Sequence, residues 1–125
     1  MQNGWIQDEG IDDRAHLVEI GGELDIASAS QLKDLFERLI AAGKRELVVD
    51  LAQAEFIDST TIGVLVRGVN QLEPLGGVMA VVCVKPELLK TFEIAALDQV
   101  VGLYPSRDEA LAYLRAADAR PAATG

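Results

Sequence analysis

The sequence predicts a single α/β domain in which a mixed sheet of four or five strands carries about four helices. Apolar segments of strand length alternate with helical patterns from residue 17 onward, which implies crossover connections and a largely parallel sheet. Half of the 125 residues are hydrophobic, enough to bury a core, and the length suits one domain. We place the domain at residues 1–117 and interpret residues 118–125, rich in small side chains, as a flexible tail.

The first two elements are predicted to be strands. Residues 4–8 (GWIQD) and 14–22 (RAHLVEIGG) have strand composition, and the turn-prone residues 9–13 separate them. A connection this short joins antiparallel neighbours. The first strand is therefore expected to make the sheet mixed.

A helix is predicted over residues 27–43. Ser28 and Gln31 match a capping box at its start, and Gly43 is placed to end it. Its apolar residues recur at helical spacing: Leu32, Leu35, Phe36, Leu39 and Ile40.

Two apolar runs, 46–51 (ELVVDL) and 78–84 (VMAVVCV), are predicted to be central strands, because strands covered by helices on both faces are apolar throughout. A helix is predicted between them, ending at residues 74–77 (PLGG). Its apolar residues at helical spacing are Ile62, Leu65, Val66, Val69 and Leu72.

The last third of the chain predicts a helix over 86–97, a short strand over 100–104 and a final helix over 106–117. Ser106 is the expected cap of the final helix, and Glu109 completes another capping box. Strand and helix therefore alternate to the end of the domain.

Composition limits the classes of partner. Twenty acidic against 11 basic residues give a net charge of −9, which argues against nucleic acid and anionic membrane surfaces and suits a partner with a basic face. The N-terminus lacks a basic region followed by an apolar stretch, and no apolar run approaches the roughly 20 residues that cross a bilayer. We expect a cytoplasmic protein without membrane insertion.

Motifs of catalysis and cofactor binding are missing from the sequence. It has no P-loop and no G-x-G-x-x-G after a strand. The single histidine, His16, has neither a nucleophile nor metal ligands at a useful spacing, and the single cysteine, Cys83, lies in an apolar run typical of a core. We therefore expect no enzymatic activity, no cofactor and no metal site.

Response-regulator receivers are an alternative of similar length and element type. They use an acidic pair, an aspartate at a strand end and a lysine before proline, for which this chain offers Asp12–Asp13, Asp50 and Lys85–Pro86. The order of elements disagrees, because the acidic pair precedes a strand and Lys85 comes one strand–helix unit too early. The order of elements therefore argues against the receiver interpretation.

Asp58, Ser59, Thr60 and Thr61 lie where a strand gives way to a helix. All are favoured N-cap residues, so capping alone would explain them. A helix N-terminus also suits a phosphate, because unpaired N–H groups and the positive end of the helix dipole face it. A phosphoryl group on Ser59 would add nearly two negative charges, which the fold could tolerate and a docked partner could not.

The segments GGELDIASASQL (21–32) and FIDSTTIGVLV (56–66) together resemble the STAS domain, specifically bacterial anti-sigma factor antagonists, and the likeness runs from about Val18 to Leu114. The resemblance implies that Ser59 is phosphorylated by the cognate anti-sigma factor, an ATP-dependent serine kinase, and dephosphorylated by a PP2C-type phosphatase. The unphosphorylated form would bind the anti-sigma factor and thereby free a sigma factor. Asp25 is expected beside Ser59.

One position departs from the family pattern. The family usually has glycine two residues after the phosphorylated serine, where this chain has Thr61, whose β-branched side chain could weaken docking or change partner choice. Gly63 keeps the family's second glycine, either for docking or for a close helix–sheet contact. The partner-binding residues implied are Asp25, Asp58, Ser59, Thr60, Thr61 and Gly63.

Two other functions stay open. STAS domains also serve as partner-binding subunits of bacterial lipid-transport complexes or signalling assemblies that have no phospho-switch. A small-molecule or nucleotide-binding domain could use the same helix N-terminus, although the missing Gly-rich loop counts against it.

Overall fold

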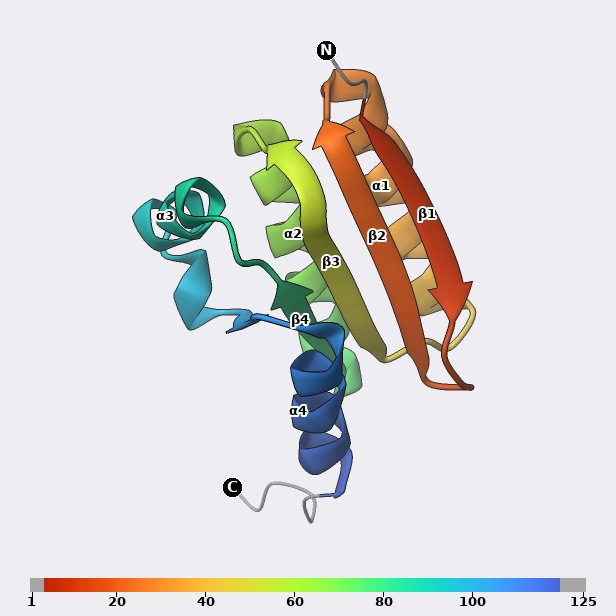
Figure 1. The fold of residues 1–125 in the computed structure, drawn as a ribbon. Helices are drawn as coiled ribbons and strands as arrows, with labels where there is room; N and C mark the ends of the chain where they lie inside the picture. The colour runs from red at the N-terminus through yellow and green to blue at the C-terminus, as the bar shows by residue number, and fades with distance from the viewer. Residues whose placement is uncertain (1–3, 120–125) are drawn as a thin grey trace.

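In the computed structural model, which describes residues 4–119, five strands form one mixed sheet in the order β1-β2-β3-β4-β5 (Figure 1). The strands are β1 (Trp5–Gly10), β2 (Ala15–Glu23), β3 (Glu46–Phe56), β4 (Val78–Val82) and β5 (Gly102–Tyr104). β1 is antiparallel to β2, and every other neighbouring pair is parallel. The predicted fold class and the mixed character of the sheet are confirmed.

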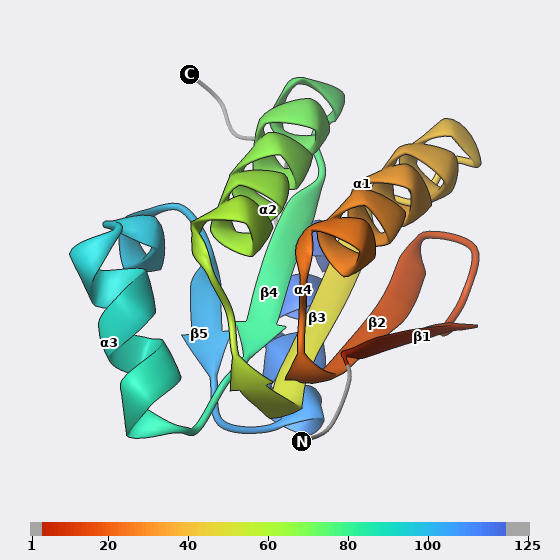
Figure 2. The same cartoon turned by 90° about the horizontal axis from the view of Figure 1, so that it is seen from above.

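Helices cover the two faces of the sheet differently. The bounds are α1 (Ile26–Ala41), α2 (Ser59–Leu72), α3 (Pro86–Ile94) and α4 (Arg107–Ala119), with the short 3₁₀ helices η1 (Glu73–Leu75) and η2 (Leu97–Gln99). α1 and α2 lie side by side on one face, as Figure 2 shows, and α4 lies on the other. α3 stands at the β5 side of the molecule.

Each face of the sheet has its own apolar layer. The larger layer, under α1, α2 and α3, contains the fully buried Phe36 and Phe92. The smaller layer, under α4, is formed by Leu17, Val48, Ala80, Val82, Ala110 and Leu114. Successive residues of β3 therefore enter opposite layers, which confirms the prediction that the central strands are apolar on both faces.

The first helix begins earlier than predicted. Asp25, not Ser28, is the N-cap, and its carboxylate accepts a hydrogen bond from the Ser28 N–H, so the predicted capping box of Ser28 and Gln31 is wrong. β2 ends at Glu23, which leaves Asp25 in the extended conformation that an N-cap needs. The C-terminal end of α1 agrees with the prediction. Gly43 follows the helix with a φ of 98°, the left-handed conformation in which glycine commonly ends a helix.

β3 is longer than the predicted strand at 46–51. β4 pairs with it only as far as Asp50, whereas β2 stays alongside to Phe56. The register with β2 shifts after Asp50, where the Asp50 carboxylate accepts a hydrogen bond of 2.8 Å from the Ala52 N–H. The apolar run in the sequence marks only the part of the strand that has a neighbour on each side.

An ion-pair cluster fastens α4 to the sheet. Arg107, its first residue, donates from Nε to the buried Asp50 and from Nη2 to Glu19 at 2.7 Å. The hydrogen bond to Asp50 raises the pKa of Arg107. Asp50 thus has a structural partner and is not a member of an exposed acidic cluster, which removes the basis of the receiver alternative.

The final helix has its predicted cap, since the Glu109 N–H donates to Ser106 Oγ at 3.2 Å. It runs to Ala119, past the predicted domain boundary at residue 117. The remainder of the predicted tail, residues 120–125, lies outside the described residues.

Candidate functional site

Two helices begin at the same edge of the sheet. β2 and β3 are parallel neighbours, and their last residues, Glu23 and Phe56, are paired. Asp25 follows the end of β2 and Asp58 follows the end of β3 by the same number of residues. The starts of α1 and α2 therefore lie together beyond the ends of these two strands (Figures 1 and 2).

The two aspartates have the same local role. Asp58 has φ −102° and ψ −178°, and its carboxylate accepts from the Thr61 N–H at 3.0 Å. Asp25 has φ −101° and ψ −175° and accepts from the Ser28 N–H at 2.8 Å, which holds its pKa below the ordinary value. The interpretation of Asp58 as a helix cap is confirmed, and it extends to Asp25.

Ser59 is the first residue of α2 and is exposed. Because Asp58 supplies the cap, the Ser59 hydroxyl is not needed to start the helix. It makes no hydrogen bond to the described part of the chain. Thr60, the next residue, is exposed as well. The structure therefore leaves the predicted phosphoacceptor accessible at the positive end of a helix.

Thr61 differs from its two neighbours. Its side chain is completely buried, and its Oγ1 has no hydrogen-bond partner in the described residues. A buried side chain cannot contact a docked partner, so the expectation that Thr61 belongs to the docking surface, or disturbs it sterically, is wrong. The helical periodicity explains this, because Thr61 lies on the same side of α2 as the buried Val64, Leu65 and Gly68.

Gly63 faces open space. A Cβ built at this position would meet no atom within 4 Å, so the alternative that Gly63 permits a close helix–sheet contact is wrong. The glycine that close packing requires is Gly68, which was not predicted: a Cβ there would lie 2.9 Å from Met79 Cε and 3.1 Å from Phe36 Cδ2. Gly63 instead lies one turn after Ser59 on the same side of α2.

The edge also carries two exposed apolar side chains that were not predicted as functional. Ile26 directly follows Asp25, and Phe56 ends β3 two residues before Asp58. Nearby, Lys85 donates from Nζ to the Ala54 carbonyl of β3 at 2.7 Å. The sequence carried one signal for Phe56, namely an aromatic residue that lies between Glu55 and Ile57, directly before the predicted site.

The described residues hold no cluster of metal ligands, and the histidine and the cysteine are both buried. Within residues 4–119 no three His, Cys, Asp or Glu side chains are grouped to hold a metal ion. His16 Nε2 lies 2.8 Å from Asp8 Oδ1, and burial raises the pKa of Cys83. None of the described helices has both the length and the hydrophobicity that a membrane crossing requires.

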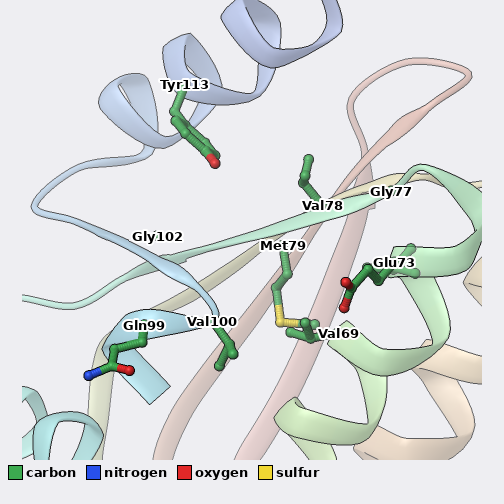
Figure 3. Close-up of a pocket in the computed structure, with 10 residues that line it drawn as sticks. Val69, Glu73, Gly77, Val78, Met79, Gln99, Val100, Gly102 and Tyr113 are labelled. Carbon is green, nitrogen blue, oxygen red and sulfur yellow. The ribbon is translucent and has the colours of Figure 1, made fainter. Parts of the chain in front are cut away.

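A cavity of about 270 Å³ lies near the C-terminal end of α2, between α2, η2 and α4 (Figure 3). Val69, Met79 and Val100 line it, and Tyr113 points toward it from α4. It contains none of the six predicted site residues, and it is far along α2 from Ser59. The alternative of a nucleotide bound at the start of α2 therefore gains nothing from this cavity.

Comparison with known proteins agrees with the fold. The family model described as the STAS domain matches residues 7–110. A Thermotoga neapolitana protein named as an anti-sigma factor antagonist and TM1081 homolog is 30% identical over 90 residues, 71% of this chain and 80% of that protein. The anti-sigma-B factor antagonist of Staphylococcus aureus is 26% identical over 89 residues, which cover 71% of this chain and 82% of that protein. The crystal structure of an anti-sigma factor antagonist from Mycobacterium paratuberculosis superposes with a TM-score of 0.81 and 28% identity, covering 90% of this chain and 94% of that one.

Proposed function

Because the chain belongs to the STAS domain family, we propose that it is an anti-sigma factor antagonist whose binding is switched by phosphorylation of Ser59. The unphosphorylated form binds an anti-sigma factor serine kinase and so releases a sigma factor. Phosphorylation of Ser59 by that kinase ends the binding, and a PP2C-type phosphatase restores it. The protein acts as a regulatory binding partner and not as an enzyme.

The accessible hydroxyl of Ser59 is the observation that carries this proposal. Asp58 already caps α2, so a modified Ser59 does not remove the cap. The helix dipole would favour a phosphate at the first position by about 0.3–1 kcal/mol, which offsets part of its repulsion from Asp58. The domain should therefore keep its fold in both states.

The docked partner has no such compensation. A phosphoryl group carries nearly two negative charges. One opposed carboxylate at ~4 Å costs on the order of 4 kcal/mol near a protein surface. Since about 1.4 kcal/mol changes affinity tenfold, a single phosphate could weaken binding by roughly a thousandfold.

The test combines the purified chain, ATP and candidate anti-sigma factor kinases from the genome that encodes it. We expect label on Ser59, full binding without label for Ser59→Ala, and weaker binding for Ser59→Asp. Thr60→Ala is the matched control, because it removes the neighbouring exposed hydroxyl and should still be labelled. Treatment with a PP2C-type phosphatase should remove the label and restore binding.

The same experiment separates the alternatives. Stable association with a protein partner but no label at Ser59 would replace this proposal with a STAS subunit of a lipid-transport or signalling complex. Binding of a nucleotide by the chain alone, without any protein partner, would favour the ligand-binding alternative.

A further inference from the structure

Two large apolar side chains flank the capping aspartates in solvent. Ile26 is 75% exposed and Phe56 is 53% exposed. A buried apolar residue accompanies each of them, since Leu24, which precedes Asp25, and Ile57, which follows Phe56, are 4% and 2% exposed. The fold therefore buries one apolar residue beside each aspartate and leaves another outside.

The fold itself does not use the outer pair. α1 is started by the Asp25 cap, which does not involve the Ile26 side chain. Phe56 lies at the end of β3, beyond the last residue that β4 pairs with, and its side chain is not part of either apolar layer. Burial on a partner is the remaining way for these side chains to contribute free energy.

We propose that Ile26 and Phe56 are the apolar anchors of the interface with the anti-sigma factor, and that the partner offers an apolar cleft bordered by basic side chains. This rests on the function proposed above. Aromatic and aliphatic anchors at the centre of an interface provide most of its binding energy, and charges at the rim provide specificity.

Charge determines the chemistry of the partner's rim. Asp25 lies next to Ile26, Asp58 lies close to Phe56, and the chain carries a net charge of −9. Glu23 and Glu55, both exposed, add two more carboxylates at the same edge. A partner that approaches Ile26 and Phe56 must face these carboxylates, so arginine or lysine opposite Glu23, Asp25 and Glu55 is the complementary arrangement. The partner group opposite Ser59 is the carboxylate on which the proposed switch depends.

The anchors also bear on the switch. Apolar contacts at this edge of the sheet would exclude water from the interface, and charges interact more strongly where water is excluded. A phosphate on Ser59, three residues after Phe56, would thus have to lose its hydration on docking. Phosphorylation of Ser59 would therefore oppose the docking of Ile26 and Phe56 on the partner.

The experiment measures the Kd of Phe56→Ala and Ile26→Ala by calorimetry against the kinase that labels Ser59. Each variant should bind about tenfold or more weakly, while thermal unfolding stays close to that of the parent chain, because both side chains are exposed. Leu75→Ala is the matched control: Leu75 is 49% exposed in η1, after the C-terminal end of α2, and its variant should bind like the parent.

Salt dependence distinguishes anchors from charged contacts. The loss caused by Phe56→Ala should be similar at about 50 mM and about 500 mM salt, whereas a loss caused by Glu23→Gln should shrink at the higher salt. If both anchor variants bind like the parent chain, this inference is overturned and the proposed function stands. If the parent chain neither binds nor is labelled by any candidate kinase, both fail. Should Phe56→Ala unfold, Ile26→Ala and Phe56→Leu decide the question.

Discussion

Replacing Gly63 with alanine should stabilise the fold and weaken the proposed complex. Gly63 lies inside the 14-residue α2, is exposed, and has no atom within 4 Å of the position that a methyl group would take. Glycine in an exposed helix interior costs about 1 kcal/mol relative to alanine. The unfolding free energy of Gly63→Ala should rise by that amount, and Tm by roughly 3–6 °C for a domain of this size.

Binding should respond in the opposite direction. Gly63 lies one turn after Ser59, so a partner docked over the start of α2 would meet the new methyl group. Forcing an additional methyl group into a packed contact costs about 1–3 kcal/mol, which corresponds to a loss of about 5- to 150-fold in affinity. A glycine that destabilises its own helix is explained if the complex needs the space.

Urea unfolding and calorimetric titration with the anti-sigma factor kinase measure the two effects on one protein preparation. Gly68→Ala is the matched control in the same helix, because its methyl group would meet Met79 and Phe36 and should destabilise the fold by about 1–3 kcal/mol. A destabilised Gly63→Ala would contradict the open environment of Gly63. A stabilised variant with unchanged affinity would show that no partner approaches this part of α2.

Three further outcomes are expected. Thr61→Val, which removes a buried hydroxyl without a partner and keeps its shape, should raise the unfolding free energy by about 1 kcal/mol in urea titrations; a decrease would mean that the hydroxyl is satisfied. The Ala15 N–H holds the pKa of Asp12 at about 2, so the stability contributed by Asp12 is complete above about pH 4 and is lost toward pH 2. Asp12→Asn should therefore lose less stability than the parent chain over that interval, and equal losses would refute this role. Arg107→Met leaves the buried Asp50 without its cation and should cost about 2 kcal/mol, part of which Asp50→Asn should restore in the double variant.

The alternation of apolar strands and helices was sufficient to predict the sheet, because each strand that helices cover leaves an uninterrupted apolar run. An apolar run does not mark the part of a strand that continues beyond the covering helices. β3 extends past residue 51 with Gln53 and Glu55 exposed and Ala54 buried, a one-sided pattern that only its pairing with β2 identifies as strand. Its true length depends on contacts with residues far away in the sequence.

The strand–helix junction that carries the candidate site was predicted correctly, but which of its side chains are buried was not. Asp58 and Ser59 lie where the sequence places them, at the junction of a strand and a helix. The burial of Thr61 was missed because α2 is apolar around much of its circumference, so Ile62, Val66 and Val69 indicate a helical phase as well as Val64 and Leu65 do. Only packing against the sheet selects between the two phases.

The Lys85–Ala54 hydrogen bond bears on aggregation at high protein concentration. Past Asp50, β3 has no strand on its β4 side within residues 4–119, and an unsatisfied backbone edge is where fibres nucleate. The Lys85 ammonium donates a hydrogen bond to the Ala54 carbonyl there. A strand from another molecule that pairs with β3 there would have to displace this ammonium, so Lys85 disfavours edge-to-edge association at this stretch of β3.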